Sequence, residues 1–445
     1  MNISEITCSD QAMENGSARL QHLIAAGLSV LLVLGLGACS SDSGSTTEIS
    51  MPDEGGEDPD ENSDPENPNP ETDPGGQPEP PTGNSQTVIT FGDIQTFEIG
   101  GVVFSSLPEA QVNTSAASVE LGRLLFWDPI LSGDMDIACA TCHLPEFGYS
   151  DGRARSAGTS GQGTGPARVP GEIGEVPRNA QTVLNTIWKG INELGVFDPA
   201  TAPMFRDNRT QSLANQALDP IRSREEMRGD NFTEAEIDAA VITRLSGISE
   251  YQVLFSDVFG ENSITMTNIG NALADYQSTL IANNSPFDRW MRGDTNAMTQ
   301  QQFNGMNLFA DTGCADCHSG PMFSNYELQV LGVAEADGLT EPDTGNGSFA
   351  FRTPTLRQLA FTGPYFHGGQ DSDLNDVIDF YDNPESSENP NVPTDQLDPD
   401  FLIMPVINES RRNAIRAFLD ALNDDSFDRT RPESVPSGLP VGGAL

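Results

Sequence analysis

The sequence predicts a mostly α-helical protein that contains two copies of one small helical unit. Apolar residues recur at helical spacing through most of the chain after residue 88, and convincing strands are few. The pentapeptide Cys-x-x-Cys-His occurs twice, as Cys139–His143 and as Cys314–His318. A similar phrase, GRLLF at 122–126 and GMNLF at 305–309, precedes each copy, which indicates an internal repeat. The chain has 445 residues, enough for two or three domains with their own cores.

The N-terminus has the pattern of a targeting signal. An apolar run begins at Leu23 and ends in Leu36-Gly-Ala-Cys39, with small residues directly before the cysteine. This pattern is typical of a bacterial lipoprotein signal peptide, which we expect at 1–38, with Cys39 acylated after cleavage. An uncleaved membrane anchor is the alternative, although the run is at the short end for a spanning helix. In both cases the rest of the chain lies outside the cytoplasm, and we expect a periplasmic protein tethered to the outer membrane.

Residues 39–87 are acidic and rich in proline. They contain thirteen acidic residues and no basic residue, with hardly any apolar side chain, so they cannot bury enough surface to fold. We expect a disordered tether that lets the folded body work away from the membrane. The whole chain has 66 acidic against 22 basic residues, which disfavours binding to nucleic acid or to an anionic membrane surface. A solvated acidic surface is the simplest interpretation of this charge.

Folded structure is expected from residue 88 onward. Apolar residues at helical spacing, bounded by Ser, Thr, Asp or Gly, predict helices at 116–126, 209–218, 234–245, 269–281, 299–309, 374–381 and 409–422. The repeat predicts a boundary between residues 281 and 299. We therefore expect an N-terminal domain at 88–285, a C-terminal domain at 286–430 and a tail at 431–445.

The two pentapeptides predict covalently attached haem. A Cys-x-x-Cys pair can form a redox disulfide, half a zinc site or thioether bonds to haem, and only the last needs a histidine directly after the second cysteine. The cysteines bond the vinyl groups of the porphyrin, and the histidine binds the iron. We expect two c-type haems, with His143 and His318 as proximal ligands. The cysteines that would attach them are Cys139, Cys142, Cys314 and Cys317.

The sixth coordination position of each iron separates an electron carrier from an enzyme. After the first pentapeptide, no histidine occurs before His318, which already has a role. Met204 and Met227 are the nearby soft side chains that could close the first iron. We therefore expect the first haem to be open, so that a small molecule can bind there.

Further phrases occur in a particular order along the chain. They are LGRLLF at 121–126, YSDGR at 149–153, RN at 178–179, QALDP at 216–220, EM at 226–227, RTPTLR at 352–357 and TGPYFHG at 362–368. With the first pentapeptide, their order and spacing resemble the bacterial dihaem cytochrome c peroxidases and their relative MauG, the dihaem enzyme of methylamine utilisation that oxidises a protein substrate. The resemblance covers about residues 100–440. It implies two cytochrome c-like haem domains packed together, preceded by the lipoprotein signal and the acidic linker.

The resemblance implies a peroxide pocket at the first haem. In this family a Gln, a Pro four residues later and a Glu six residues further on line the pocket, and these offsets fall on Gln216, Pro220 and Glu226. Reductive cleavage of the O–O bond needs a proton to move from one peroxide oxygen to the other. A carboxyl group in a dry pocket is suited to carry that proton. A solvated surface acid is the alternative for Glu226, and its neighbour Glu225 is the natural control.

The resemblance also implies the second ligand of the C-terminal haem. The family places it fourteen residues after the histidine of the TGPYFHG phrase, as methionine in most peroxidases and as tyrosine in MauG. Counted from His367, this position is Tyr381. A phenolate is a hard anionic donor that stabilises oxidised iron and lowers its reduction potential. A core role for Tyr381, with Met404 or Met322 as the ligand, is the alternative, and we do not expect His367 to bind the iron.

A calcium ion between the domains is implied as well. The resemblance assigns it to Asn179 and to the carbonyl groups of Thr362 and Pro364, with plain loop residues as the alternative. Calcium binds oxygen ligands of this kind.

The sequence departs from the family at one position between the haems. The family carries a tryptophan ten residues before the pocket glutamine, and this sequence has Arg206 there. A guanidinium cannot be oxidised as an indole can, so electron hopping through this position is not expected. Phe205, Trp188 or direct tunnelling could replace it, or the two haems could communicate poorly.

Three functions follow as hypotheses. The first is reduction of hydrogen peroxide to water, with electrons from a small cytochrome or similar donor entering through the C-terminal haem. The second is MauG-like oxidation of a side chain in a partner protein, which Tyr381 favours because a low-potential haem accepts electrons poorly from ordinary cytochromes. The third is a two-haem electron carrier without turnover. We expect the first, an oxidoreductase of the cytochrome c peroxidase type.

Overall fold

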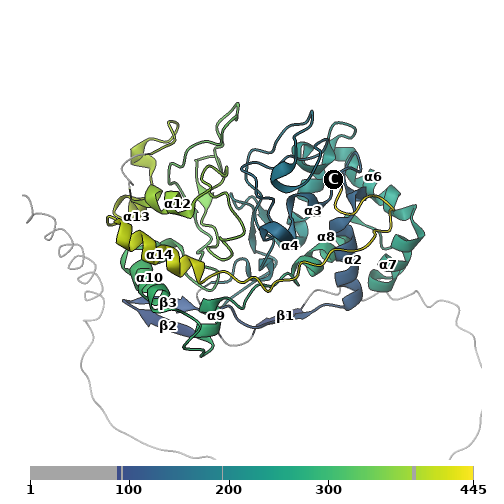
Figure 1. Cartoon of the computed structure of the whole chain (residues 1–445). Helices are drawn as coiled ribbons and strands as arrows, with labels where there is room; N and C mark the ends of the chain where they lie inside the picture. Colours follow the sequence, from purple (N-terminus) through teal and green to yellow (C-terminus); the bar gives the residue numbers. More distant parts are fainter. Residues whose placement is uncertain (1–87, 92–93, 193, 383–386, 444–445) are drawn as a thin grey trace, which may run out of the picture. The chain divides into compact units, whose positions relative to one another are not determined.

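The computed structural model describes residues 88–91, 94–192, 194–382 and 387–443, and these belong to one compact unit. The signal peptide predicted at 1–38 and the tether predicted at 39–87 lie outside the described residues. Helices dominate the described residues, as the sequence predicted, and the strands there are short (Figure 1).

The strands form antiparallel pairs, with Val88 opposite Asn113 in the first and Thr96 opposite Ser105 in the second. The pairs are β1 (Val88–Phe91) with β4 (Ala110–Asn113), β2 (Thr96–Ile99) with β3 (Val102–Ser105), β5 (Pro203–Met204) with β6 (Thr210–Gln211), and β7 (Leu328–Gln329) with β8 (Phe351–Arg352). The helices are α2 (Ala116–Trp127), α3 (Cys139–Cys142), α4 (Leu213–Gln216), α5 (Asp219–Arg222), α6 (Glu234–Ser246), α7 (Ser249–Phe259), α8 (Met266–Gln277), α9 (Pro286–Met291), α10 (Gln300–Asp311), α11 (Cys314–Cys317), α12 (Leu374–Tyr381), α13 (Pro399–Leu402) and α14 (Glu409–Asp420). Short 3-10 turns lie at Pro129–Leu131, Pro145–Phe147, Gly165–Ala167, Thr186–Trp188 and Thr394–Gln396, and a π-helical turn covers Arg224–Arg228.

Most of the predicted helices are present. Five of them agree with an observed helix to within two residues at each end. They are the helices predicted at 116–126, 234–245, 299–309, 374–381 and 409–422, which correspond to α2, α6, α10, α12 and α14. The helix predicted at 269–281 starts earlier, at Met266, because the Thr265 side chain caps it by accepting a hydrogen bond from the backbone of Asn268. The prediction of one helix over 209–218 is wrong. Ser212 has a φ of 65°, which no helix allows, so a short strand and the single turn α4 replace it.

The internal repeat corresponds to two similar helix crossings. α2 crosses α8 at Gly122, where a Cβ would lie 1.8 Å from the carbonyl oxygen of Ala272. α10 crosses α14 at Gly305, where a Cβ would lie 1.9 Å from the carbonyl oxygen of Ala414. Only glycine permits such close approach, because any side chain would overlap the partner backbone. Each copy thus packs the helix that precedes a Cys-x-x-Cys-His motif tightly against a partner helix.

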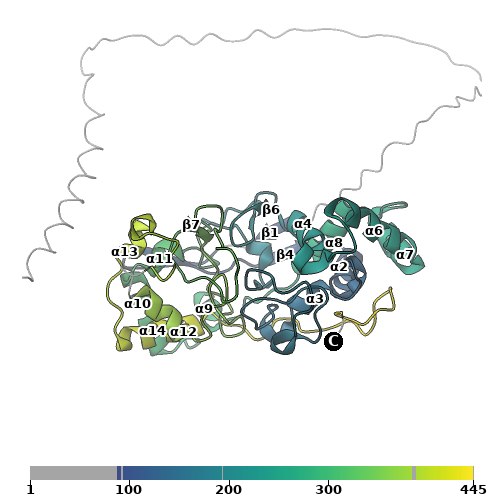
Figure 2. The ribbon, with the colours of Figure 1, turned by 90° about the horizontal axis from the view of Figure 1, so that it is seen from above.

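The two largest hydrophobic cores in the described residues each receive a segment from the other half. The first is built mainly on α2, α6, α7 and α8, and Phe427 and Val435 pack into it from the C-terminal segment. The second is built on α10, α12 and α14, and Phe104 of β3 packs into it. Figures 1 and 2 show the segment after α14 running to the half that holds α2 and α3. The boundaries at 285/286 and 430/431 remain predictions, and the segments that hold Phe104 and Phe427 each pack into the core of the other half.

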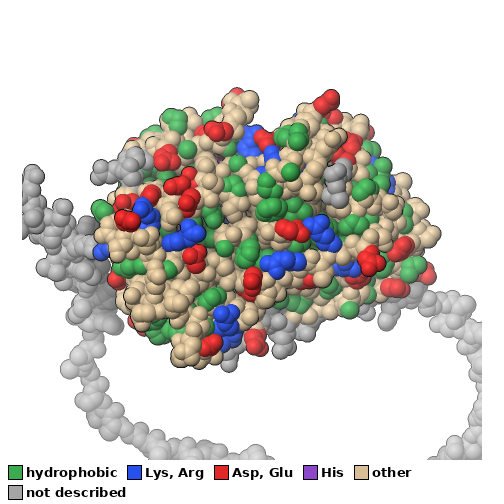
Figure 3. Space-filling view, viewed as in Figure 1, with side chains coloured by type: hydrophobic (Ala, Val, Ile, Leu, Met, Phe, Trp, Pro, Cys, Tyr) green, Lys and Arg blue, Asp and Glu red, His purple; other side chains and the backbone are tan. Residues whose placement is uncertain are grey.

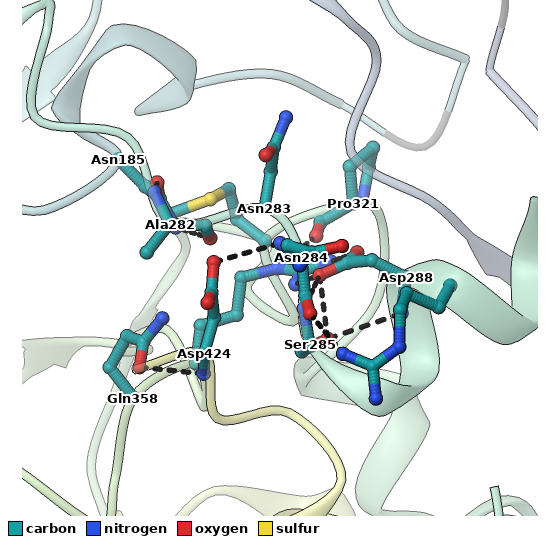
Figure 4. A network of polar contacts seen from close by, with 12 residues as sticks. Asn185, Ala282, Asn283, Asn284, Ser285, Asp288, Pro321, Gln358 and Asp424 are labelled. Atoms are coloured by element: carbon teal, nitrogen blue, oxygen red, sulfur yellow. Dashed lines mark hydrogen bonds and ion pairs between the residues drawn. The ribbon is translucent and has the colours of Figure 1, made fainter. Parts of the chain in front are cut away.

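A polar network surrounds the segment that leads from α8 to α9 (Figure 4). The Asn185 side chain donates to the carbonyl oxygen of Ala282 at 2.8 Å and accepts from its N–H at 2.7 Å. Asp288 of α9 forms a two-point ion pair with Arg357, at 2.9 and 3.0 Å, and both side chains are almost fully buried. Since a buried charge is tolerated only when it is paired, this contact anchors the segment between the two halves.

The surface mixes charges of both signs. Figure 3 shows acidic and basic side chains interspersed over one face. Some form exposed ion pairs, such as Arg416 with Asp420 at 3.2 Å, which contribute little stability each. Within the part of the chain that the structure describes, no helix has both the length and the apolar character needed to cross a bilayer.

Candidate active site

The first Cys-x-x-Cys-His motif forms the single helical turn α3, which ends at His143. Cys139 and Cys142 form no disulfide. The Nδ1 of His143 lies 3.0 Å from the carbonyl oxygen of Tyr149. Because a carbonyl oxygen only accepts hydrogen bonds, Nδ1 carries the proton and Nε2 keeps its lone pair. Burial lowers the pKa of His143, which also favours the neutral ring.

The second motif repeats this arrangement. Cys314 and Cys317 lie on α11 and form no disulfide. The Nδ1 of His318 lies 3.0 Å from the carbonyl oxygen of Phe323, and burial lowers the pKa of His318 to about 4. Both histidines are therefore held in the neutral tautomer that binds a metal through Nε2.

Each motif faces its own cavity. The two cysteines and the histidine of the first motif line one cavity, and those of the second motif line another. The walls of both cavities are mostly apolar. Free thiols, an imidazole with an available Nε2 and an apolar wall are what a c-type haem requires. The residues present in each cavity thus fit a covalently attached haem.

The three residues predicted for the peroxide pocket all line the first cavity, together with His143. Gln216 comes from α4, Pro220 from α5, and Glu226 from the π-helical turn. The structure therefore brings together, at one cavity, the pocket residues and the histidine that the sequence predicted separately.

Backbone contacts fix the π-helical turn from two sides. A Cβ on Gly158 would lie 1.8 Å from the carbonyl oxygen of Glu225, so only glycine fits there. The N–H of Thr159 donates to the carbonyl oxygen of Glu226 at 2.8 Å. From the other side, the N–H of Gly133 donates to the carbonyl oxygen of Met227, in the same turn, at 2.8 Å. π-Helical turns are rare and occur often at functional sites. Here the turn holds the backbone of Glu226 rigidly while its side chain lines the cavity.

The carboxyl group of Glu226 makes no hydrogen bond or ion pair with a described residue. Burial raises its pKa from 4.5 to about 7. By contrast, the Glu225 side chain is 45% exposed and lies 3.6 Å from Arg224. A carboxyl group with a pKa near neutrality can both accept and donate a proton, so Glu226 is suited to proton transfer and Glu225 is not.

Among the described residues that line the first cavity, His143 is the one histidine. Met204 lies outside this lining and is buried, whereas Met227 lines the cavity and also packs into the first core. An open sixth position at this haem stays a prediction, which the lack of a second histidine in the lining supports.

The second cavity contains all three candidates for the second iron ligand. Tyr381 of α12, Met322 and Met404 line it together with His318. The Tyr381 hydroxyl makes no hydrogen bond with a described residue, and burial raises the pKa of Tyr381 above its usual value. Its ring packs edge-on against Phe401, with centroids 5.9 Å apart. Tyr381 as the ligand therefore stays a prediction.

His367 also lines the second cavity, where its ring packs against another aromatic ring. It stacks on Phe351 with ring centroids 4.0 Å apart. Burial lowers the pKa of His367 to about 4, and its buried Nε2 has no hydrogen-bond partner among the described residues.

One wall separates the two cavities. The residues that line both are Asn179, Ala180, Gln181, Thr182, Lys189 and Arg206. Arg206, which stands where the family has tryptophan, thus lies between the two predicted haems. Phe205 lines the first cavity alone, and Trp188 is fully buried and lines neither.

The predicted calcium site stays a prediction, and its ligand Asn179 already has another partner in this arrangement. The Oδ1 of Asn179 accepts a hydrogen bond from the guanidinium of Arg206 at 2.8 Å, and the Asn179 carbonyl oxygen lies 3.4 Å from the Arg206 Nε. Thr362 and Pro364 line the second cavity. A calcium ion bound to Asn179 would meet the positive charge of Arg206 directly, and we assign no role to it.

Sequence reasoning missed two features of the site. It did not foresee the π-helical turn, which depends on contacts from distant glycines. It also gave no role to Lys189, although a single lysine in 445 residues was a signal that could have drawn attention to it.

Comparison with known proteins agrees with this geometry. The family model described as di-haem cytochrome c peroxidase matches residues 116–296. The cytochrome c551 peroxidase of Nitrosomonas europaea is 30% identical over 353 residues, which cover 77% of this chain and 91% of that protein. The methylamine utilization protein MauG of Methylorubrum extorquens is 35% identical over 284 residues, which cover 62% of this chain and 72% of that protein.

Solved structures share the fold. A MauG-like protein associated with microbial copper homeostasis superposes with a TM-score of 0.58 at 23% identity, covering 70% of this chain and 91% of that one. The diheme peroxidase BthA of Burkholderia thailandensis superposes with a TM-score of 0.55 at 19% identity, covering 81% of this chain and 99% of that one.

Proposed function

Because this chain belongs to the di-haem cytochrome c peroxidase and MauG family, and is therefore an oxidoreductase of the cytochrome c peroxidase type with two c-type haems, we propose that it reduces hydrogen peroxide at the first cavity. The electrons come from a small cytochrome or similar donor and enter through the haem of the second cavity. Each turnover takes one peroxide, two protons and two electrons to two water molecules. Membership of this family of enzymes sets aside the hypothesis of a carrier without turnover.

The observation that carries the proposal is the position of Glu226. Its carboxyl group lines the same cavity as His143, without a hydrogen-bond partner among the described residues and with a pKa raised to about 7. The bound haem supplies the iron to which peroxide binds and the electrons that reduce it. Glu226 takes the proton from one peroxide oxygen and returns it to the other, so that the departing oxygen leaves as water. Gln216 and Pro220 shape the pocket around the peroxide.

Turnover and ligand binding test this proposal together. The full-length protein, loaded with both haems, should oxidise reduced cytochrome c when hydrogen peroxide is added, and cyanide should bind one haem of the two. The same mixture without hydrogen peroxide gives the baseline rate of cytochrome c oxidation. If cyanide bound neither haem, or if no donor supported turnover, the proposed peroxidase function would be refuted.

MauG-like oxidation of a partner protein is the second candidate function. It is favoured by Tyr381, which lines the second cavity and whose hydroxyl group has no hydrogen-bond partner among the described residues. A tyrosinate ligand lowers the potential of a haem, and a low-potential haem accepts electrons poorly from ordinary cytochromes. Fast reaction with peroxide, combined with slow turnover against reduced cytochrome c and against small phenolic donors, would favour this second function over the first.

We also propose that the enzyme works in the periplasm, held to the outer membrane by a lipid on Cys39. The LGAC sequence that ends at Cys39 supports this location. Metabolic labelling with a radioactive fatty acid, compared between the natural chain and Cys39→Ser, tests it. Equal labelling of the two proteins would contradict it.

A further inference from the structure

Three cations gather in and beside the wall between the two cavities. Lys189 and Arg206 line both cavities, and Arg352 lines the second. They influence one another, since the charges of Arg206 and Arg352 help burial to lower the pKa of Lys189 to about 7. Burial, followed by the charges of Arg352 and Arg178, likewise lowers the pKa of Arg206 to about 9.

None of these three cations is paired with a carboxylate among the described residues. The ammonium group of Lys189 makes no hydrogen bond or ion pair there. Arg206 donates to Asn179 alone, from Nη2 to Oδ1 at 2.8 Å and from Nε to the carbonyl oxygen at 3.4 Å. Arg352 donates to the carbonyl oxygen of Phe205 at 2.8 Å and to the side chain of Gln181 at 2.7 Å.

The neighbouring Arg178 shows what a paired cation looks like in this region. It contacts Asp207 at 2.7 Å and Asp343 at 2.6 Å. This chain has three times as many acidic as basic residues, 66 against 22, so carboxylates are abundant. No described carboxylate contacts Lys189, Arg206 or Arg352 directly, and Asp343 and Asp207 act on Arg206 and Arg352 only from a distance. Because buried cations without a contacting counter-ion are unfavourable, we expect a negative charge from outside the protein chain at this site.

We propose that Lys189 and Arg206 form a carboxylate-binding site for the propionate groups of the two haems. The haems are the family's cofactors, and their propionates are the anions that belong in these cavities. Each residue reaches both cavities, so the site links the two haems electrostatically. The inference rests on the presence of the haems and not on which substrate the enzyme oxidises or reduces.

The positive charges of Lys189 and Arg206 affect the reduction potentials of the two haems. A cation beside a haem disfavours the ferric state, which carries one more positive charge than the ferrous state. Lys189 and Arg206 therefore raise the potentials, opposite in direction to a tyrosinate ligand. Removing either charge should lower the potential of at least one haem.

Spectroelectrochemical titration of the full-length protein with both haems attached tests this. Lys189→Met and Arg206→Met should each lower the midpoint potential of at least one haem by about 59 mV or more. This value corresponds to a tenfold change in the equilibrium constant of a one-electron reduction. Lys189→Arg keeps the charge, so its midpoint potentials should differ from those of the natural protein by less than half of that value. Arg411→Met, on α14 and outside both cavity linings, is the control and should change nothing.

Two results would overturn the proposal. The first is unchanged potentials in both methionine variants, with haem content confirmed by the pyridine haemochrome assay. The second is a wild-type potential that depends on chloride or phosphate concentration, because the site would then hold a free inorganic anion. Neither result depends on peroxide turnover, so failure here is separate from failure of the proposed function.

Discussion

The guanidinium of Arg206 donates a hydrogen bond to the Oδ1 of Asn179 at 2.8 Å. This contact places a fixed positive charge on the side chain that the family resemblance assigns to calcium. Arg206 thus supplies a positive charge from the protein chain itself at the wall between the two cavities.

Removal of divalent cations follows as a first prediction. Incubation with EGTA and gel filtration should leave peroxide turnover and both haem spectra unchanged, because the Asn179 side chain already accepts a hydrogen bond from Arg206. Atomic absorption should find no stoichiometric calcium. Loss of activity on chelation, restored by calcium, would show that the ion displaces Arg206 from Asn179.

The ligand of the second haem gives a second prediction. Tyr381→Phe removes the hydroxyl group from the second cavity and keeps the ring that packs on Phe401. Electron paramagnetic resonance should show one low-spin haem signal replaced by a high-spin signal. Tyr365→Phe, which lines the same cavity, is the matched control. An unaltered low-spin signal in Tyr381→Phe would transfer the role to Met404 or Met322.

The buried ion pair of Arg357 and Asp288 gives a third prediction, on stability. Arg357→Met leaves the Asp288 carboxylate, whose side chain is 0% exposed, without its partner, and should lower the free energy of unfolding by about 3–5 kcal/mol. The comparison is Arg431→Met at the exposed pair with Glu146, where the loss should be below about 1 kcal/mol. Urea denaturation followed by circular dichroism measures both. Similar losses for the two variants would contradict the account.

The pH dependence of the reaction with peroxide gives a fourth prediction. Burial raises the pKa of Glu226 to about 7, and only the deprotonated carboxylate can accept the proton of the incoming peroxide. The second-order rate constant should therefore rise with pH, with a midpoint near 7, as Glu226 loses its proton. Glu225→Gln should keep this profile. A rate that is flat between pH 5 and pH 9 would show that Glu226 does not take the proton.

The sequence predicted the parts of the fold that depend on local pattern. α12, at Leu374–Tyr381, has the predicted ends because its apolar spacing and the cap at Asp373 are both local. The helix predicted across residues 209–218 failed, because the backbone at Ser212 is left-handed and nothing in the apolar spacing reveals that. α7 (Ser249–Phe259) and the N-terminal strands were not predicted; Tyr251 and Phe255 of α7 pack into the first core and Phe104 of β3 into the second, and these contacts join residues far apart in the sequence.

In the candidate site, too, the sequence predicted what depends on local motifs and not what depends on packing. The Cys-x-x-Cys-His motifs predicted the two haem sites, and the family resemblance predicted Gln216, Pro220 and Glu226, which line the first cavity together. The shared wall could not be predicted, because Lys189 and Arg206 lie seventeen positions apart and meet only through the packing of the two halves. Nor could the raised pKa of Glu226, which results from burial in a cavity that several distant segments build.

The central claim is that Glu226 carries the proton in peroxide cleavage at the first cavity. Stopped-flow measurement of the reaction between hydrogen peroxide and the full-length protein with both haems, followed in the Soret band, tests it most directly. Glu226→Gln should lower the second-order rate constant by a factor of about 10²–10⁴ while the starting spectra stay intact, and Glu225→Gln should react like the natural protein. A Glu226→Gln rate within twofold of the natural protein would contradict the account.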